Sequence, residues 1–220
     1  LFLEPSEDQV FKTHPWNETV FPLLKANGYY TGLVGKWHAP QPQPEMSMAF
    51  DYTNLYFGWH WEPRNGVMRH VTDLNLEDSI HFLRNRPMDK KFALKVSFFA
   101  THAWDGHHPP FEPKNETKTR FYNNVTIPRP KTSTEAHWKD MPQFFTDNNE
   151  GRRRWKNRYD PENYQNSIKD LYRMATEVDL AVGQIIDLLK EQGVYNKTLL
   201  IFTTDNGNMH GEHGLAEKWY

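Results

Sequence analysis

The sequence predicts an α/β fold with a mostly parallel central sheet. Three short apolar runs, at residues 31–34, 92–99 and 198–204, fit buried strands. Between them lie segments with helical patterning, of which residues 167–192 are the clearest because their apolar side chains recur every three or four positions. Strands that alternate with helices of this length form parallel sheets joined by right-handed crossovers. The alternation therefore indicates the fold class.

Local signals define the first elements. Residues 17–28 favour a short helix, with Asn17 or Thr19 as its N-cap and Gly28 just beyond its end. Residues 39–44 are rich in proline, and we expect a loop there.

The middle of the chain alternates between regular and irregular patterning. Residues 51–65 carry many aromatic side chains, and we expect an irregular segment that flanks the site or packs beside it. Residues 71–83 follow the spacing of an amphipathic helix. Residues 104–160 hold most of the prolines and much charge, so we expect an insert with little regular structure. Within it, the basic cluster at residues 152–156 either faces solvent or contacts an anionic polymer.

Composition excludes several classes of protein. The chain has 220 residues, enough for one substantial core, and a formal net charge of −2. No basic field points to nucleic acid or to an anionic membrane. The sequence contains no apolar run of membrane-spanning length and no signal-peptide pattern. Cysteine is absent, which excludes disulfides and thiolate metal sites.

Glycosylation sequons permit a secreted, periplasmic or lysosomal location. Four of them begin at Asn17, Asn115, Asn124 and Asn196. The chain starts with Leu1 rather than Met and stops at Tyr220, directly after a motif, so we expect it to be a piece of a longer protein.

The polar segment at residues 203–215 carries the strongest chemical signal. It follows the third apolar run and combines an Asp-Asn pair with a glycine-rich stretch, and Lys218 comes shortly after it. Ligands of open parallel sheets sit beyond the carboxyl ends of strands, so Asp205 and Asn206 offer two hard oxygen donors suited to Ca²⁺ or Mg²⁺. The alternative is a strand closed by an Asn-Gly turn, with the histidines and the lysine in solvent.

A second segment, residues 27–38, places a short strand before a Gly-Lys-Trp-His cluster at residues 35–38. Together the two segments resemble the sulfatase family, whose members carry G-Y-x-T-x-x-x-G-K-W-H and, later, D-N-G followed by G-x-H-G-L and a lysine. The resemblance implies an alkaline-phosphatase-like α/β/α sandwich. Residues 1–220 would then be a partial catalytic domain with the irregular insert at about residues 104–160.

The resemblance assigns a part to each cluster. Lys36 and Lys218 correspond to the two lysines that contact the sulfate. Asp205 and Asn206 correspond to ligands of a calcium ion. His38 corresponds to the histidine that touches the nucleophile and helps to expel sulfate from it. The alternatives are a surface lysine after a strand for Lys36, and a packing histidine for His38.

A third region, residues 97–111, resembles the family's strand that ends in an H-x-P loop. His107 begins a His-His-Pro sequence and so fits the histidine that contacts the sulfate and protonates the leaving oxygen. His102 is the rival for this role, because the loop between the two is longer than the commonest form. His213 either lines the substrate pocket or is structural.

One part of the family pattern is missing. The family's nucleophile is a formylglycine made from Cys or Ser in a C-x-P-S-R or S-x-P-S-R motif, and residues 4–7, Glu-Pro-Ser-Glu, do not match it. The paired aspartates that complete the metal site are missing as well. We therefore expect the nucleophile upstream of this sequence and expect the 220-residue piece alone to be inactive. The alternative is a degenerate relative.

The resemblance thus predicts a sulfuric ester hydrolase that uses one calcium ion and acts on a small-molecule or polysaccharide sulfate ester, with a sulfated carbohydrate favoured. The first alternative is a phosphatase or phosphodiesterase of the same superfamily. The second is a non-catalytic protein that binds sulfated glycans. We expect no nucleic-acid partner and no membrane segment.

Overall fold

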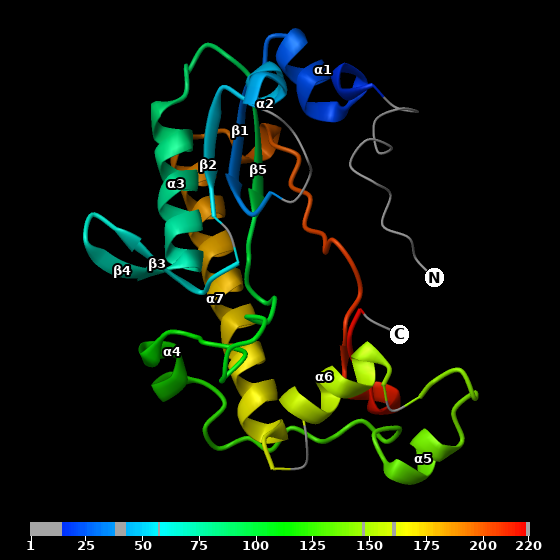
Figure 1. The fold of residues 1–220 in the computed structure, drawn as a ribbon. Coiled ribbons are helices and arrows are strands. Elements are labelled where there is room, and N and C mark those ends of the chain that lie inside the picture. The colour runs from blue at the N-terminus through cyan, green and yellow to red at the C-terminus, as the bar shows by residue number, and fades with distance from the viewer. Residues whose placement is uncertain (1–14, 38–42, 57, 147, 160–161, 219–220) are drawn as a thin grey trace. The chain divides into compact units, whose positions relative to one another are not determined.

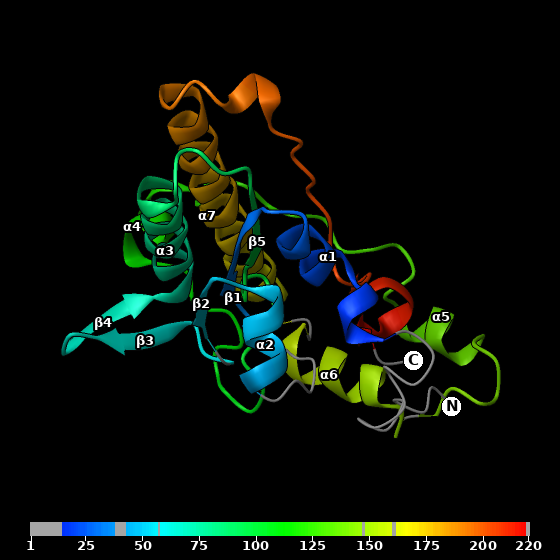
Figure 2. The same cartoon turned by 90° about the horizontal axis from the view of Figure 1, so that it is seen from above.

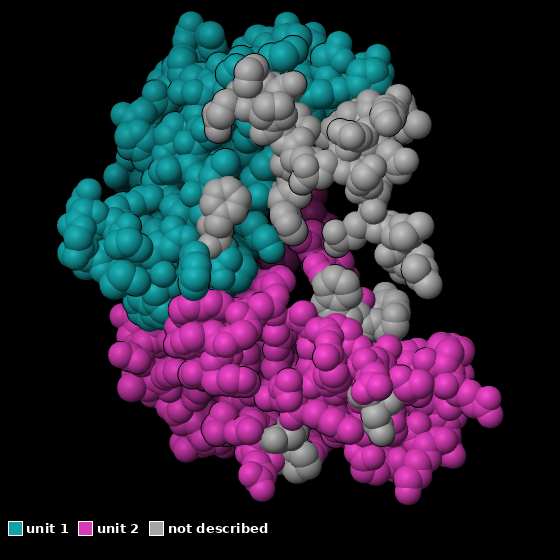
Figure 3. Space-filling model, viewed as in Figure 1, with its two compact units in different colours: residues 1–99, 181–189 teal, residues 100–180, 190–220 magenta. Residues whose placement is uncertain are grey.

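The computed structural model describes the chain in five stretches and divides it into two compact units (Figure 3). The described stretches are residues 15–37, 43–56, 58–146, 148–159 and 162–218. Unit 1 comprises Leu1–Phe99 and Ala181–Leu189, and unit 2 comprises Ala100–Leu180 and Lys190–Tyr220. Among the described residues, no helix combines the length and the apolar character needed to cross a bilayer.

Unit 1 is built around a three-stranded parallel sheet in the order β2, β1, β5. Helix α3 covers one face of the sheet, and α1 and α2 cover the other (Figures 1 and 2). The strands are β1 (Tyr30–Gly35), β2 (Tyr52–Leu55) and β5 (Phe92–Ser97), and the helices are η1 (Trp16–Glu18), α1 (Val20–Ala26), α2 (Gln43–Ala49) and α3 (Val71–Asn85). The strands predicted at residues 31–34 and 92–99 and the helix predicted at residues 71–83 are therefore confirmed.

Side chains of β1 alternate between the two faces of this sheet, as the pleat of a strand requires. Val34 packs with Leu74 of α3, and Leu33 packs with Met46 of α2. Gly32 leaves room for the ring of Phe82, which lies 2.6 Å from the position that a Cβ atom would take. The apolar run that the sequence showed is thus the central, doubly covered strand of unit 1.

Two expectations for unit 1 are wrong. The loop predicted over residues 39–44 gives way to α2 at Gln43, because proline is tolerated in the first turn of a helix. Residues 38–42 lie outside the described residues. The segment predicted as irregular, residues 51–65, contains β2 and the first strand of a hairpin, because its aromatic residues fit strands as well as loops. That hairpin consists of β3 (Trp61–Arg64) and β4 (Val67–His70).

Unit 2 has its own core, which draws on residues from five of its segments. It contains α4 (Asn115–Arg120), α5 (Glu135–Lys139), α6 (Glu150–Arg158), η2 (Tyr195–Lys197), β6 (Met209–His210), η3 (Glu212–Gly214) and β7 (Ala216–Glu217). Helix α7 (Tyr164–Glu191) confirms the predicted long helix, and its residues are shared between the units. The prediction of little regular structure over residues 104–160 is wrong for three short helices, two of which are capped by Thr134 and Asn149.

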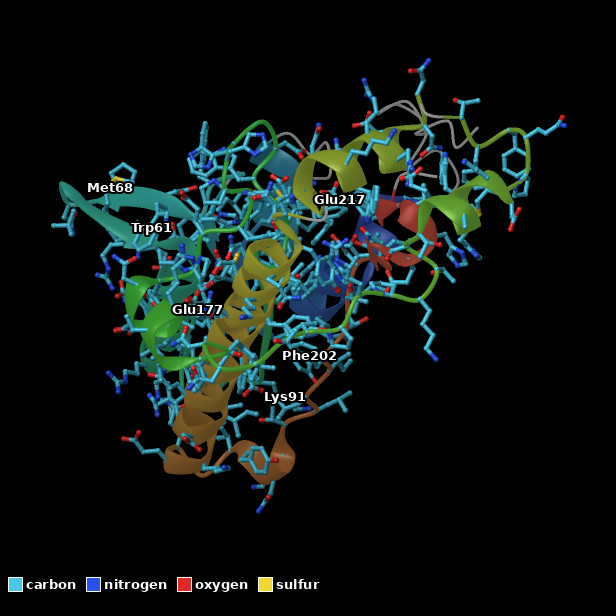
Figure 4. All side chains as sticks on the ribbon, turned by 90° about the horizontal axis from the view of Figure 1, so that it is seen from below. Trp61, Met68, Lys91, Glu177, Phe202 and Glu217 are labelled. Atoms are coloured by element: carbon cyan, nitrogen blue, oxygen red, sulfur yellow. The ribbon has the colours of Figure 1, made fainter. Side chains whose placement is uncertain are left out.

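The strand predicted at residues 198–204 does not form. Leu199, Ile201 and Phe202 are 83%, 78% and 81% exposed, and Phe202 is labelled on this extended segment in Figure 4. A strand needs a neighbour to complete its hydrogen bonds, and no strand among the described residues pairs with this segment. An apolar run predicts strand character, but it does not supply the partner.

The basic cluster at residues 152–156 is neither a solvated surface nor an anion site as a whole. The guanidinium of Arg152 is fully buried and lies 4.2 Å and 4.6 Å from the ring centroids of Trp138 and Trp155. It also pairs with Glu135 at 2.6 Å. Arg153 and Lys156, by contrast, are exposed. Cation–π stacking makes Arg152 part of the core of unit 2.

Candidate active site

Lys36 directly follows β1, at the carboxyl end of the sheet of unit 1. The preceding residue, Gly35, has a φ of 97°, and a Cβ atom there would lie 2.1 Å from the carbonyl oxygen of Ser97 and 2.7 Å from Nδ2 of Asn75. Only glycine allows β1 to come so close to β5 at this point. The approach lets the Lys36 N–H donate to the Ser97 carbonyl at 2.8 Å. Gly35 therefore fixes the backbone from which the lysine projects.

The side chains of Lys36 and Trp37 pack on opposite sides of the sheet. Lys36 Nζ lies 5.4 Å from the ring centroid of Phe99, which belongs to the α3 side of the sheet. Trp37 instead packs edge-on against Trp16 and Phe50 on the side of α1 and α2. The tryptophan of the motif is thus a packing anchor. His38, the next residue of the motif, lies outside the described residues.

His107 lies in a closed loop of unit 2. The Trp104 N–H donates to the Pro110 carbonyl at 2.8 Å, and the His107 N–H donates to the Trp104 carbonyl at 3.2 Å. The rings of Trp104 and His107 stack with centroids 3.8 Å apart. His107 Nδ1 is 3.0 Å from the Pro109 carbonyl oxygen, and because a carbonyl only accepts, Nδ1 carries hydrogen. Nε2 is therefore the nitrogen left for proton transfer.

The other two histidines of the prediction have different surroundings. His102 places Nδ1 2.6 Å from the Ala103 carbonyl oxygen, so its Nδ1 is also a donor, and its rivalry with His107 stays open. His213 is tied into unit 2 by its Nδ1, 3.0 Å from His137 Nε2, and by its N–H, which donates to Thr132 Oγ1 at 2.9 Å. These contacts match the structural alternative for His213.

Lys218 directly follows a small hairpin formed by β6 and β7. Gly214, in the turn of this hairpin, has a φ of 65°, and a Cβ atom there would lie 2.4 Å from Nη1 of Arg152. The same Nη1 donates to the Gly214 carbonyl at 3.4 Å. Packing on a buried guanidinium thus accounts for this glycine of the G-x-H-G motif. The exposed Lys218 stands at the end of the braced hairpin.

Asp205 and Asn206 lie on the exposed segment that precedes this hairpin. Asp205 makes no hydrogen bond or ion pair within the described residues, and Asn206 uses its Nδ2 to donate to the Gly207 carbonyl at 2.6 Å. The carboxylate and the amide Oδ1 are hard donors of the kind that calcium takes. Calcium needs six to eight oxygens, however, and the described residues contain no group of three or more His, Asp or Glu placed to hold a metal. The pair fits as one part of a calcium site.

Sequence reasoning missed four charged residues that join two of the predicted segments. Asp105, two positions before His107, and Glu217, directly before Lys218, both bind the guanidinium groups of α6. The donors are Arg154 and Arg158. Their spacing of four residues, which places both on one side of a helix, was the signal in the sequence that could have identified them.

The structure therefore joins two of the segments that carry predicted site residues. Within unit 2 it ties the loop of His107 and the hairpin before Lys218 to one helix. Lys36 belongs to unit 1, so its convergence with Asp205 and Asn206 stays a prediction.

A cavity of about 320 Å³ opens in unit 2 beside the loop of His107. Its apolar lining residues are Pro109, Pro110 and Phe111. The other lining residues are polar, namely His108, Asn157, Asn163, Asn166, Ser167 and Asp170. Apolar and hydrogen-bonding residues thus line the same cavity.

Known proteins place these features in a family. A family model described as "Sulfatase" matches residues 5–220, nearly the whole chain. The chain belongs to the sulfatase family. The resemblance that the Gly-Lys-Trp-His and Asp-Asn-Gly segments suggested is thereby confirmed.

Curated sulfatases align with most of this chain. An N-acetylglucosamine-6-O-sulfatase of Bacteroides thetaiotaomicron is 23% identical over 92% of this chain and 46% of its own length. An arylsulfatase of Clostridium perfringens is 28% identical over 68% of this chain and 29% of its own length. This sulfatase chain thus spans less than half the length of either relative.

A solved structure shares the fold. It is a complex of a protein with its substrate, D-glucosamine-2-N,6-O-disulfate, and it aligns with a TM-score of 0.64 and 20% identity. The alignment covers 94% of this chain and 53% of the other. The predicted α/β class with a parallel central sheet is confirmed.

Proposed function

We propose that the whole protein is a sulfuric ester hydrolase that releases inorganic sulfate from a sulfated carbohydrate. The family match over residues 5–220, with Lys36 placed at the carboxyl end of β1, is the observation that carries this proposal. An amino-sugar sulfate is favoured by two relatives: one is named for N-acetylglucosamine 6-O-sulfate, and the other is bound to a sulfated glucosamine. The cavity beside the His107 loop supports a sugar, because its polar lining residues can bind hydroxyls and its apolar ones can pack against a pyranose ring.

Each candidate site residue has a separate role in the proposed reaction. The ammonium groups of Lys36 and Lys218 bind the non-bridging sulfate oxygens and stabilise the charge that develops on them. His107 gives the Nε2 proton to the bridging oxygen as the S–O bond breaks, so that the alcohol leaves neutral. His38 moves a proton at the nucleophile.

The proposal needs two groups that are not among the described residues, a calcium ion and the nucleophile. Asp205 and Asn206 would hold a calcium ion with their side-chain oxygens, and the bound ion supplies positive charge beside the sulfate. The nucleophile is assigned to a formylglycine outside residues 1–220, because those residues contain no cysteine and no matching motif. The lysines and histidines of the chain bind and protonate the ester around that group.

Sulfate release by the full-length protein tests the proposal. We would compare N-acetylglucosamine 6-sulfate, glucosamine-2-N,6-O-disulfate and an aryl sulfate with the corresponding phosphate esters. Release of sulfate from at least one sulfated sugar, with much slower release of phosphate, is the expected result. A preference for phosphate esters would instead support the phosphatase alternative, and binding of sulfated sugars without turnover would support the non-catalytic one.

Two lysine variants with a matched control connect the activity to the site. Lys36→Ala and Lys218→Ala should each lower kcat by about 10²–10³-fold, because each removes one charge that stabilises the transition state. Lys90→Ala, an exposed lysine of unit 1, should leave kcat unchanged. Full activity of either Lys36→Ala or Lys218→Ala would remove that lysine from the proposed site.

A further inference from the structure

Two arginines of α6 join segments of unit 2 that lie far apart in the sequence. Arg154 Nη1 donates to Asp105 Oδ1 at 2.9 Å and to Glu217 Oε2 at 2.5 Å. Arg158 Nη2 donates to Asp105 Oδ1 at 2.5 Å, and its Nη1 pairs with Glu217. Figure 4 labels Glu217, which lies beside α6. The four side chains form a charge-balanced quartet.

Burial makes this quartet more than a surface ion pair. The side chains of Arg158 and Glu217 are only 8% and 10% exposed. Charges so deeply placed are retained only when they are paired, and a planar guanidinium is suited to bridging two carboxylates. Burial raises the pKa of Asp105, but the hydrogen bond from Arg158 and the charges of both arginines outweigh it and hold the pKa below its usual value. Asp105 is therefore charged and engaged at neutral pH.

The loop that Asp105 anchors is internally braced, so its side chains move as one body. The backbone bond from Trp104 to Pro110 closes the loop, and a second backbone bond joins His107 to Trp104. Stacking of the Trp104 and His107 rings adds a third constraint. Fixing Asp105 on α6 thus fixes the direction of the imidazole two residues later.

We propose that Arg154 and Arg158 are positioning residues that hold His107 at the leaving-group oxygen. Both arginines also hold Glu217, the residue that directly precedes Lys218. This inference rests on the proposed function and on the role of His107 as general acid. In that role the His107 proton passes to the bridging oxygen while the S–O bond breaks and its electron pair stays on the oxygen, so the geometry matters most for a poor leaving group.

The test compares two leaving groups on the full-length protein. N-acetylglucosamine 6-sulfate releases an alkoxide-like oxygen that needs protonation, whereas 4-nitrophenyl sulfate releases a stable phenolate that does not. Arg158→Gln should lower kcat for the sugar ester by about 10- to 100-fold, part of the full effect of a general acid, and for the aryl ester by less than about 3-fold. The fall in kcat at alkaline pH should also become shallower for the sugar ester. Arg158→Lys keeps the positive charge but loses the planar guanidinium that can bridge two carboxylates, so its kcat for the sugar ester should lie between those of the unaltered protein and Arg158→Gln.

Controls separate positioning from folding. Arg153→Gln alters an exposed arginine on the same helix and should leave both rates unchanged. Should Arg158→Gln fail to fold, Asp105→Asn makes the same comparison at a half-exposed position that keeps its shape. Equal losses on the two esters, or losses confined to KM, would overturn the inference while leaving the sulfatase proposal standing. An unaltered protein that cleaves neither ester would overturn both.

Discussion

Substitution of Gly35 by alanine tests how the motif strand ends. Gly35 has a φ of 97°, and a left-handed backbone costs an L-residue about 1–2 kcal/mol. The added methyl would also lie 2.1 Å from the Ser97 carbonyl oxygen, which is backbone and can move only if β1 and β5 separate. Overpacking of this kind costs about 1–3 kcal/mol. We therefore expect Gly35→Ala to lower the free energy of unfolding by about 2–5 kcal/mol.

Gly28 provides a matched control. Its φ is 82°, but nothing lies within 4 Å of the position that its Cβ would take. Gly28→Ala should therefore cost only the backbone component, about 1–2 kcal/mol. Urea unfolding of the two variants, followed by fluorescence and circular dichroism, measures the difference. Equal losses for the two variants would refute the claim that close approach of β1 to β5 requires Gly35.

Three further perturbations concern groups that are buried or paired in the fold. Arg152→Met removes a stacked and paired guanidinium and should lower the free energy of unfolding, measured with urea, by about 2–4 kcal/mol. The control Arg153→Met should change it by no more than about 0.5 kcal/mol. Equal effects of the two substitutions would contradict the buried role of Arg152. Burial lowers the pKa of His210 below 6.5, so the folded state binds fewer protons than the unfolded state in this range. Stability should therefore fall as the pH drops below 6.5 toward the folded pKa. His210→Gln should make the melting temperature depend less on pH in that window. Partial burial raises the pKa of Asp51, but hydrogen bonds from Lys25 and Thr31 outweigh this effect and lower the pKa. Asp51 therefore stabilises the fold above pH 3.8, and this contribution is lost in stronger acid. Because the residue is exposed, Asp51→Asn should lower the free energy of unfolding by at most about 1 kcal/mol at neutral pH and by almost nothing near pH 2, as urea unfolding at the two pH values would show.

Sequence patterns predicted well where one side chain or one period decides the structure. The periodic apolar stripe of α7 and the doubly covered run of β1 specify an element without reference to distant residues. The glycine before Lys36 was part of the Gly-Lys-Trp-His pattern, but only the structure shows that it lets the backbone approach Ser97. Family motifs assigned Lys36, His107 and Lys218 to the site, and this assignment stays a prediction.

The same patterns failed where a distant partner decides. An apolar run predicted a strand at residues 198–204, yet no strand among the described residues pairs with it. The basic cluster at residues 152–156 was expected to face solvent or to contact an anionic polymer, yet Arg152 enters the core while Arg153 faces solvent. In both cases the local sequence is the same whether or not the partner is present.

By itself the sequence determined the family and the central strand and supplied the candidate site residues, because each depends on a short pattern of side chains. The tertiary structure alone decided that Asp105 and Glu217, more than one hundred residues apart in the chain, meet on the two arginines of α6. Ion pairs between distant segments leave no periodicity in a sequence, since only folding brings their charges within hydrogen-bonding distance.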